Sequence, residues 1–86
     1  MKEMRILGIH VENRVAEAGE VQGILTKYGC SIRTRLGLHE ADDRNCATNG
    51  LILLELGGDA AEWDTLEKAV AACKGVTVKR MSFQTA

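Results

Sequence analysis

The sequence predicts one small α+β domain whose elements follow the order βαββαβ. Three stretches carry this prediction. In residues 21–38 a helical spacing of apolar residues gives way to strict alternation, residues 50–56 form an almost unbroken apolar run, and residues 63–73 return to helical spacing. Periods of 3.6 and 2 are typical of helices and strands with one covered face. With 86 residues, the chain is expected to form a single domain over residues 1–86.

The first half of the chain predicts a strand, a helix and a second strand. Residues 4–11 alternate as a strand does, and Asn13 is the expected N-cap of the helix that follows. The best-specified part of that helix has apolar residues at positions i, i+3, i+4 and i+7, namely Val21, Ile24, Leu25 and Tyr28. Gly29 is expected to end the helix in the left-handed region. Alternation over residues 32–38 then predicts the second strand.

The second half predicts a strand, a helix and a last strand. Residues 40–49 are polar and lack periodicity, so we expect a loop there. The apolar run at residues 50–56 suits a central strand. Asp59 and Glu62 have the spacing of a capping box, and the second helix follows with one apolar stripe, formed by Trp63, Leu66, Val70 and Cys73. Val76 and Val78 begin the last strand.

Two split βαβ units in this order are typical of the ferredoxin-like fold, an α+β sandwich. We expect a four-stranded antiparallel sheet with the strand order 4-1-3-2 and both helices on one face. The helices are expected to cover Leu7, Ile9, Ile32, Leu36, Ile52, Leu54, Val76 and Val78, with Arg33 and Arg35 on the other side. That other side also carries Ile6, Leu51, Leu53, Met81 and Phe83.

The apolar residues of the uncovered side predict association between copies of the chain. Burial of three such side chains favours association by roughly 4 to 9 kcal/mol before ordering costs. We therefore expect a homodimer or a higher homo-oligomer, with an interface formed by Ile6, Leu51, Leu53 and Met81.

Composition limits the class of protein further. The formal net charge is −1, so no broad positive field is present and no direct nucleic-acid binding is expected. The longest apolar run is too short to cross a bilayer, and no signal segment opens the chain, so we expect a cytoplasmic protein without membrane contact. Three cysteines without a C-x-x-C spacing favour reduced thiols over a disulfide framework or a standard zinc site. No cofactor is expected.

Four short motifs, in the same order, resemble those of the iron-only hydrogenase system regulators. They are residues 8–14 (GIHVENR), the Tyr28-Gly29 pair with Ile32, residues 34–37 (TRLG) and residues 75–79 (GVTVK). Two departures occur, since Thr34 replaces a glycine and residues 38–40 (LHE) replace a Pro-Tyr. The resemblance implies an ACT-like, non-catalytic regulatory domain that forms homo-oligomers and binds a small effector at subunit boundaries.

The candidate effector site is the polar loop between the first strand and the first helix. Glu12, Asn13 and Arg14 lie there, where ACT-like domains often hold small effectors, and Arg35 is a further candidate contact. Free N–H groups at a helix start, with an arginine nearby, suit a carboxylate or a phosphate. The alternative is a helix-capping loop with a solvated ion pair.

The sequence also contains residues that would suit two other functions. His39 and Cys46 offer an imidazole and a thiolate across the predicted hairpin, which would suit a nickel, zinc or copper sensor. His10 is expected to lie two strand spacings, roughly 9 to 10 Å, from His39 and so cannot join it directly. An acylphosphatase-like enzyme would need Arg14 and Asn49 together, but the first loop lacks a glycine-rich phosphate cradle, so we expect no catalysis.

Overall fold

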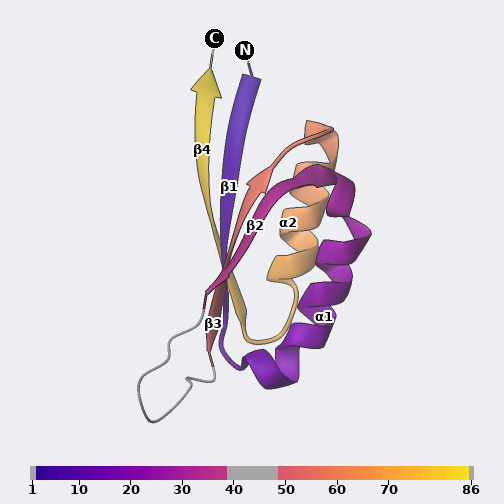
Figure 1. The fold of residues 1–86 in the computed structure, drawn as a ribbon, viewed down its shortest axis with the longest axis vertical. Coiled ribbons are helices and arrows are strands. Elements are labelled where there is room, and N and C mark those ends of the chain that lie inside the picture. The colour runs from indigo at the N-terminus through magenta and orange to yellow at the C-terminus, as the bar shows by residue number, and fades with distance from the viewer. Residues whose placement is uncertain (1, 39–48, 86) are drawn as a thin grey trace.

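The computed structural model of the chain describes residues 2–38 and 49–85, which form one sheet and one layer of helices (Figure 1). The elements are β1 (Lys2–Val11), α1 (Arg14–Lys27), β2 (Ile32–Leu38), β3 (Gly50–Leu56), α2 (Trp63–Ala71) and β4 (Val76–Thr85). Short 3-10 helices occupy Gly29–Ser31 and Ala60–Glu62. The elements therefore follow the predicted βαββαβ order.

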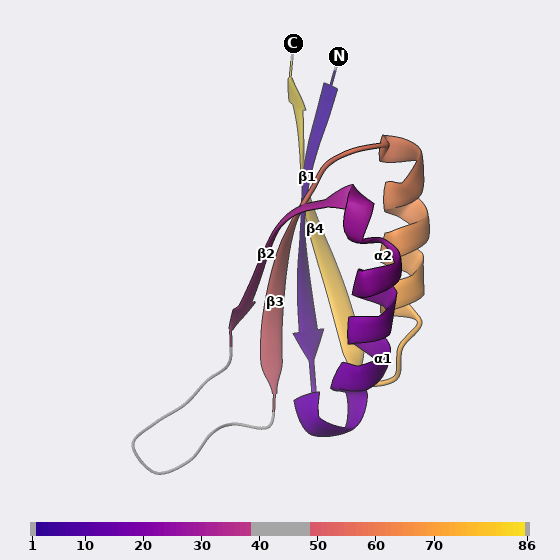
Figure 2. The ribbon, with the colours of Figure 1, turned by 45° about the vertical axis from the view of Figure 1, so that its right-hand side comes forward.

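The sheet is antiparallel throughout, and its strands lie in the order β2-β3-β1-β4. Counted from the β4 edge, this order reads 4-1-3-2. In this order β1 and β3 are the central strands. Both helices pack against one face of the sheet, and the opposite face has no helix over it (Figure 2). This arrangement is compatible with a ferredoxin-like fold. Within the described residues, no helix is long and apolar enough to span a membrane.

The core lies between the sheet and the two helices. Leu7, Ile9 and Leu54 from the central strands are fully buried against residues of both helices. The helical residues in this core are Val21, Leu25, Trp63, Leu66 and Val70, with Cys73 just after α2. The predicted apolar stripe of the second helix is thus confirmed. Ile32, Ile52, Val76 and Val78 are partly buried and pack against the same cluster.

A β-bulge in β2 corrects the prediction for two of its side chains. The pairing register with β3 shifts between Ile32 and Thr34. A bulge adds one residue to one strand, and a shift of one residue moves the following side chains to the other face. Leu36, predicted to lie under the helices, pairs with Leu53 and is half exposed on the uncovered face. Arg35 instead lies on the helical side.

The outer ends of β1 and β4 extend past the helices as a two-stranded ribbon (Figure 1). β1 and β4 pair along their full lengths, from Lys2 with Thr85 to Val11 with Val76. The pairing of β3 with β1, by contrast, reaches only Ile6. We call residues 2–5 and 82–85 the terminal ribbon. Its β1 residues have no pairing partner on β3.

The chain leaves β3 through Gly57 and Gly58. Gly58 has a φ of +65°, and a Cβ atom on it would lie 2.7 Å from the carbonyl oxygen of Cys30. A left-handed conformation predicted for Gly29 is wrong, because Gly29 lies in a 3-10 helix and the described glycines with positive φ are Gly58 and Gly75. Asp59 caps the next 3-10 helix by accepting a hydrogen bond from the amide of Ala61 at 2.9 Å.

We predict that Gly58→Ala lowers the free energy of unfolding by about 1 to 3 kcal/mol, because a side chain strains the left-handed backbone and meets the carbonyl oxygen of Cys30. Urea denaturation followed by circular dichroism measures this difference. Gly29→Ala is the matched control, since a Cβ there meets nothing within 4 Å. The control should leave stability unchanged or raise it slightly. Equal losses in both variants would contradict the assignment of Gly58.

Candidate functional site

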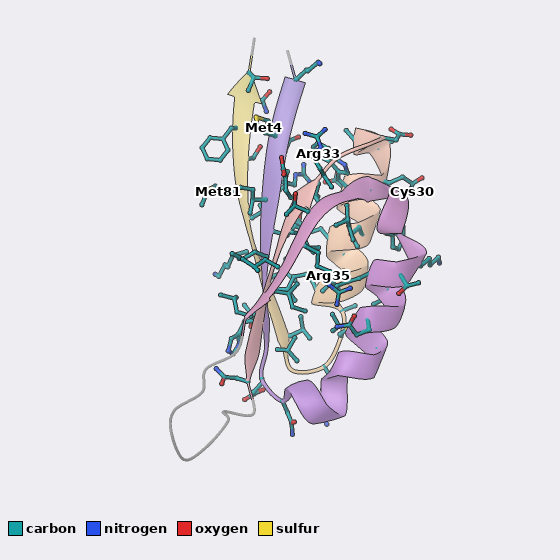
Figure 3. All side chains as sticks on the ribbon, viewed as in Figure 1. Met4, Cys30, Arg33, Arg35 and Met81 are labelled. Carbon is teal, nitrogen blue, oxygen red and sulfur yellow. The ribbon has the colours of Figure 1, made fainter. Side chains whose placement is uncertain are left out.

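The open face of the sheet, which is the side away from the helices, carries apolar residues on all four strands. Five of them are strongly exposed, with relative exposures of 49% for Met4, 50% for Leu36, 37% for Leu51, 54% for Met81 and 49% for Phe83. Ile6 and Leu53 lie among them and are partly covered by their neighbours. Met4 and Met81 point away from the helices in Figure 3. We call these seven residues the apolar patch.

The patch is continuous across the sheet. Met4 lies opposite Phe83 and Ile6 opposite Met81 on neighbouring strands, while Leu53 lies opposite Leu36. Gly8 separates the two halves on β1, and the Leu53 side chain reaches over it, since a Cβ on Gly8 would lie 3.8 Å from Leu53 Cδ2. Side chains opposite each other on one face are in contact range. The apolar surface is therefore one patch rather than scattered exposed residues.

The four residues predicted for an oligomer interface, Ile6, Leu51, Leu53 and Met81, all lie in the apolar patch. Met4 and Leu36 also belong to the patch but are absent from the predicted interface. Met4 lies near the start of β1, and its pairing with the exposed Phe83 depends on the register between β1 and β4, which the sequence does not reveal. Leu36 reaches this face because of the bulge in β2. No partner chain is present, so the interface role of these residues stays a prediction.

Polar side chains stand around the patch. Glu55 on β3 accepts a hydrogen bond from Thr34 Oγ1 at 3.0 Å and lies 3.7 Å from an Arg33 Nη atom. Lys79 lies opposite Gly8 on the same face. His10 Nε2 is 3.3 Å from Asn49 Nδ2 at the far end of β1. The open face therefore has an apolar centre with charges of both signs at its margins.

A cavity of about 580 Å³ lies beside the terminal ribbon, at the point where the chain leaves β3. We call it the β1 notch. It is lined by Lys2, Glu3 and Met4 of β1, by Arg33 and Glu55, and by the segment that ends β3 and begins the second helix, including Gly57, Gly58, Ala60 and Trp63. Trp63 Nε1 donates a hydrogen bond to the carbonyl oxygen of Gly57 at 2.8 Å, which fixes this wall.

A buried arginine joins the terminal ribbon to α2. Arg5 is only 7% exposed, and its guanidinium donates to Glu3 Oε2 at 2.7 Å and to Asp64 Oδ1 at 2.8 Å. A third carboxylate, that of Glu67, lies 3.2 Å away, and the Trp63 ring centroid is 5.5 Å from the guanidinium carbon. The hydrogen bonds from Arg5 hold the pKa of Glu3 and of Asp64 below the ordinary carboxyl range.

The predicted effector loop lies at the opposite end of β1 from the notch. Glu12 and Asn13 connect β1 to α1, and the Glu12 amide donates to the carbonyl oxygen of Gly75 at 2.8 Å. Glu12 and His10 line a cavity of about 330 Å³ together with the start of β4. Arg14 is the first residue of α1, and its side chain lies outside the described part of the structure.

Arg35 is not placed with this loop. It hydrogen-bonds Gln22 in the middle of α1, on the helical side of the sheet. Gln22 lies eight residues beyond Arg14, which corresponds to roughly 12 Å along a helix. The structure therefore brings Glu12 and Asn13 together, but it separates Arg35 from them. The prediction that Arg35 projects from the open face is wrong because of the bulge in β2.

The predicted metal ligands His39 and Cys46 lie outside the described residues, so the metal-sensor hypothesis stays a prediction. Within residues 2–38 and 49–85, no three histidine, cysteine or acidic side chains come together as ligands of an ion. Among the described cysteines, Cys30 is exposed, and Cys73 is buried with its thiol donating a hydrogen bond to the carbonyl oxygen of Ala69 at 3.6 Å.

The sequence matches no protein-family model and no curated protein. Among solved structures, the uncharacterized protein TM1266 from Thermotoga maritima superposes with a TM-score of 0.79 at 24% identity, over 96% of this chain and 100% of that chain. LarC2 is the C-terminal domain of a cyclometallase involved in the synthesis of the NPN cofactor of lactate racemase. It gives a TM-score of 0.51 at 12% identity, over 96% of this chain and 57% of that chain. At these identities the likeness concerns the fold alone.

We predict that the protein loses stability in acid through Glu3 and Asp64. Both pKa values are lower in the folded chain, so their contribution to the free energy of unfolding is present above the ordinary carboxyl range. It is lost as the pH falls through the lowered values, between roughly pH 5 and pH 2. Urea denaturation at stepped pH should show this decline, and Arg5→Met should make it shallower.

Arg35→Met is the control for this measurement, because Arg35 hydrogen-bonds the neutral side chain of Gln22. That variant should keep the pH dependence of the unsubstituted protein. If Arg5→Met and the unsubstituted chain lose stability in parallel as the pH falls, the carboxylates of the Arg5 cluster are not the source of the acid sensitivity.

Proposed function

We propose that the chain is a non-catalytic, ACT-like regulatory module of the cytoplasm, that its copies join through the apolar patch, and that a small effector is held at the boundary between them. The observation that carries this proposal is the continuous apolar patch on the open face, with five strongly exposed large side chains. Contiguous apolar surfaces with a polar margin mark interaction sites. Scattered single residues would need no such explanation.

A second copy of the chain is the partner that suits this face. A two-fold interface uses the same surface on both protomers, so the surface must be complementary to itself. The apolar patch meets this condition, because its centre is apolar and its margin carries both signs, with Lys2 and Lys79 against Glu55. Apolar centres with polar rims are typical of protein interfaces.

The regulatory part of the proposal comes from the resemblance to the iron-only hydrogenase system regulators. It is supported by the four sequence motifs, which in the described residues fall on β1 and the start of α1, the α1–β2 connection, β2 and β4. The regulated system that this resemblance indicates is an iron-only hydrogenase.

A non-catalytic role is supported by a serine–carboxylate contact in the described part of the chain. Ser82 Oγ donates to Glu3 at 2.7 Å, but Arg5 lowers the pKa of Glu3. A carboxylate with a lowered pKa is a poor general base for activating a hydroxyl. This contact is therefore better explained as part of the structure of the terminal ribbon.

Sedimentation or light scattering at micromolar concentration tests the association of copies. We expect a dimer or larger species, and we expect Met81→Lys to weaken association by about tenfold or more, since a buried methionine contributes roughly 1.5 to 3 kcal/mol. Met81 is highly exposed in the single chain, so the folded protomer should tolerate the substitution.

The matched control is Thr77→Lys, which adds the same charge on the same face of β4, four residues from Met81 and away from the apolar patch. This variant should associate as the unsubstituted chain does. A monomeric unsubstituted chain at micromolar concentration would overturn the proposal, as would equal weakening by the two lysine substitutions.

A further inference from the structure

We infer that the β1 notch is a binding site for a small organic anion, which Lys2 and Arg33 hold by its carboxylate or phosphate group. The notch exists because three strands differ in length. β1 and β4 continue as the terminal ribbon, while β3 ends at Leu56 and the chain turns away at Gly57 and Gly58. The cavity left beside β1 measures about 580 Å³, within the size range of small-molecule sites.

The acidic side chains of the notch already have partners within the protein. Glu3 accepts hydrogen bonds from two guanidinium nitrogens of the buried Arg5, at 2.7 and 3.2 Å, and one from Ser82. Glu55 accepts a hydrogen bond from Thr34 and forms an ion pair with Arg33 across 3.7 Å. Both carboxylates are therefore engaged by protein groups.

The basic side chains of the notch keep their hydrogen-bond donors free within the described residues. Lys2 forms no ion pair with any residue in the described ranges. Arg33 is 66% exposed, and its closest approach to Glu55 is 3.7 Å, longer than a direct hydrogen bond. Figure 3 shows Arg33 beside the end of β3, whereas Arg35 lies toward α1. The notch thus offers two cations, of which Arg33 can bind a planar carboxylate or a phosphate through two hydrogen bonds.

The remaining lining suits the organic part of such an anion. Met4 of β1 and Ala60 of the 3-10 helix before α2 add apolar side chains to the lining. A Cβ on Gly57 would lie 3.3 Å from Arg33 Cβ and Nε, so a larger residue at this position would crowd the arginine side chain. Pockets of this kind combine apolar walls with a few polar groups that fix the orientation of the ligand.

The notch also lies at the margin of the apolar patch. Lys2 and Met4 belong to the open face, so a second copy packed on the patch would border the notch. The regulatory meaning of the site rests on the proposed association of copies, since a ligand there would contact the boundary between protomers. Binding of the anion itself does not depend on association and is measured separately.

The test is a titration of the full chain, labelled with 15N, with succinate and separately with inorganic phosphate, in a buffer free of other small oxyanions. We expect saturable shifts of the Gly57 and Gly58 amides with at least one of these probes. Arg33→Gln should weaken binding on the order of tenfold, the loss typical of one hydrogen-bonded charge. Response to succinate alone indicates a carboxylate ligand, and response to phosphate alone indicates a phosphorylated one.

Arg35→Gln is the matched control, because it removes the same charge from the same strand two residues away and outside the notch. It should change the affinity by less than twofold. The inference is overturned if neither probe shifts the two glycine amides, or if Arg33→Gln and Arg35→Gln weaken binding equally. An associating chain without anion binding overturns this inference alone, and a monomeric chain with specific binding overturns only the proposed association.

Discussion

Two helices cover only one face of a four-stranded sheet, and this limit decides where the apolar residues of the chain lie. The covered face holds a small aliphatic core, with Leu7, Ile9 and Leu54 at its centre. The open face keeps a second apolar surface of seven residues, which the chain cannot bury by itself. In a domain of this size the buried core is thin, so an apolar surface left outside it is a substantial part of the total.

The different lengths of the strands give the open face its second feature. β3 ends early because Gly57 and Gly58 direct the chain toward α2, while β1 and β4 continue as the terminal ribbon. Arg5 attaches this ribbon to α2 through the carboxylates of Asp64 and Glu67 and the ring of Trp63. The same cluster uses Glu3 as a partner, which leaves Lys2 and Arg33 as the groups of the notch that can meet an anion.

Local patterns in the sequence predict the elements well because each pattern reports a periodicity set by the backbone itself. The stripe of Leu66 and Val70 predicts the buried side of α2, and the alternation around Ile9 predicts the buried side of β1. Alternation fails on β2, since a bulge near Arg33 changes the side of every later residue and leaves no mark in the pattern. The left-handed conformation predicted for Gly29 occurs at Gly58 instead. The local pattern does not reveal this, because the close contact of Gly58 is with Cys30, which is distant in sequence.

Of the two candidate sites, the apolar patch follows from local sequence patterns and the β1 notch does not. The apolar patch was largely predictable, since Ile6, Leu51 and Leu53 alternate with core residues on strands identified from the sequence. The notch was not predictable, because it depends on the register that sets Lys2 beyond the end of β3 and on partners that occupy Glu3 and Glu55. The Gly57-Gly58 pair, which ends β3 while β1 continues, is the sequence signal that could have indicated it.

The pairing of Lys2 with Thr85 brings the two ends of the described chain to neighbouring positions on adjacent strands. Neighbouring strands are about 4.8 Å apart, so the domain begins and ends at nearly the same point in space. Such a domain fits into a surface loop of a host protein without forcing the two sides of that loop apart. A larger polypeptide can therefore accept this fold as an insertion at one site, or contain several copies joined by short linkers.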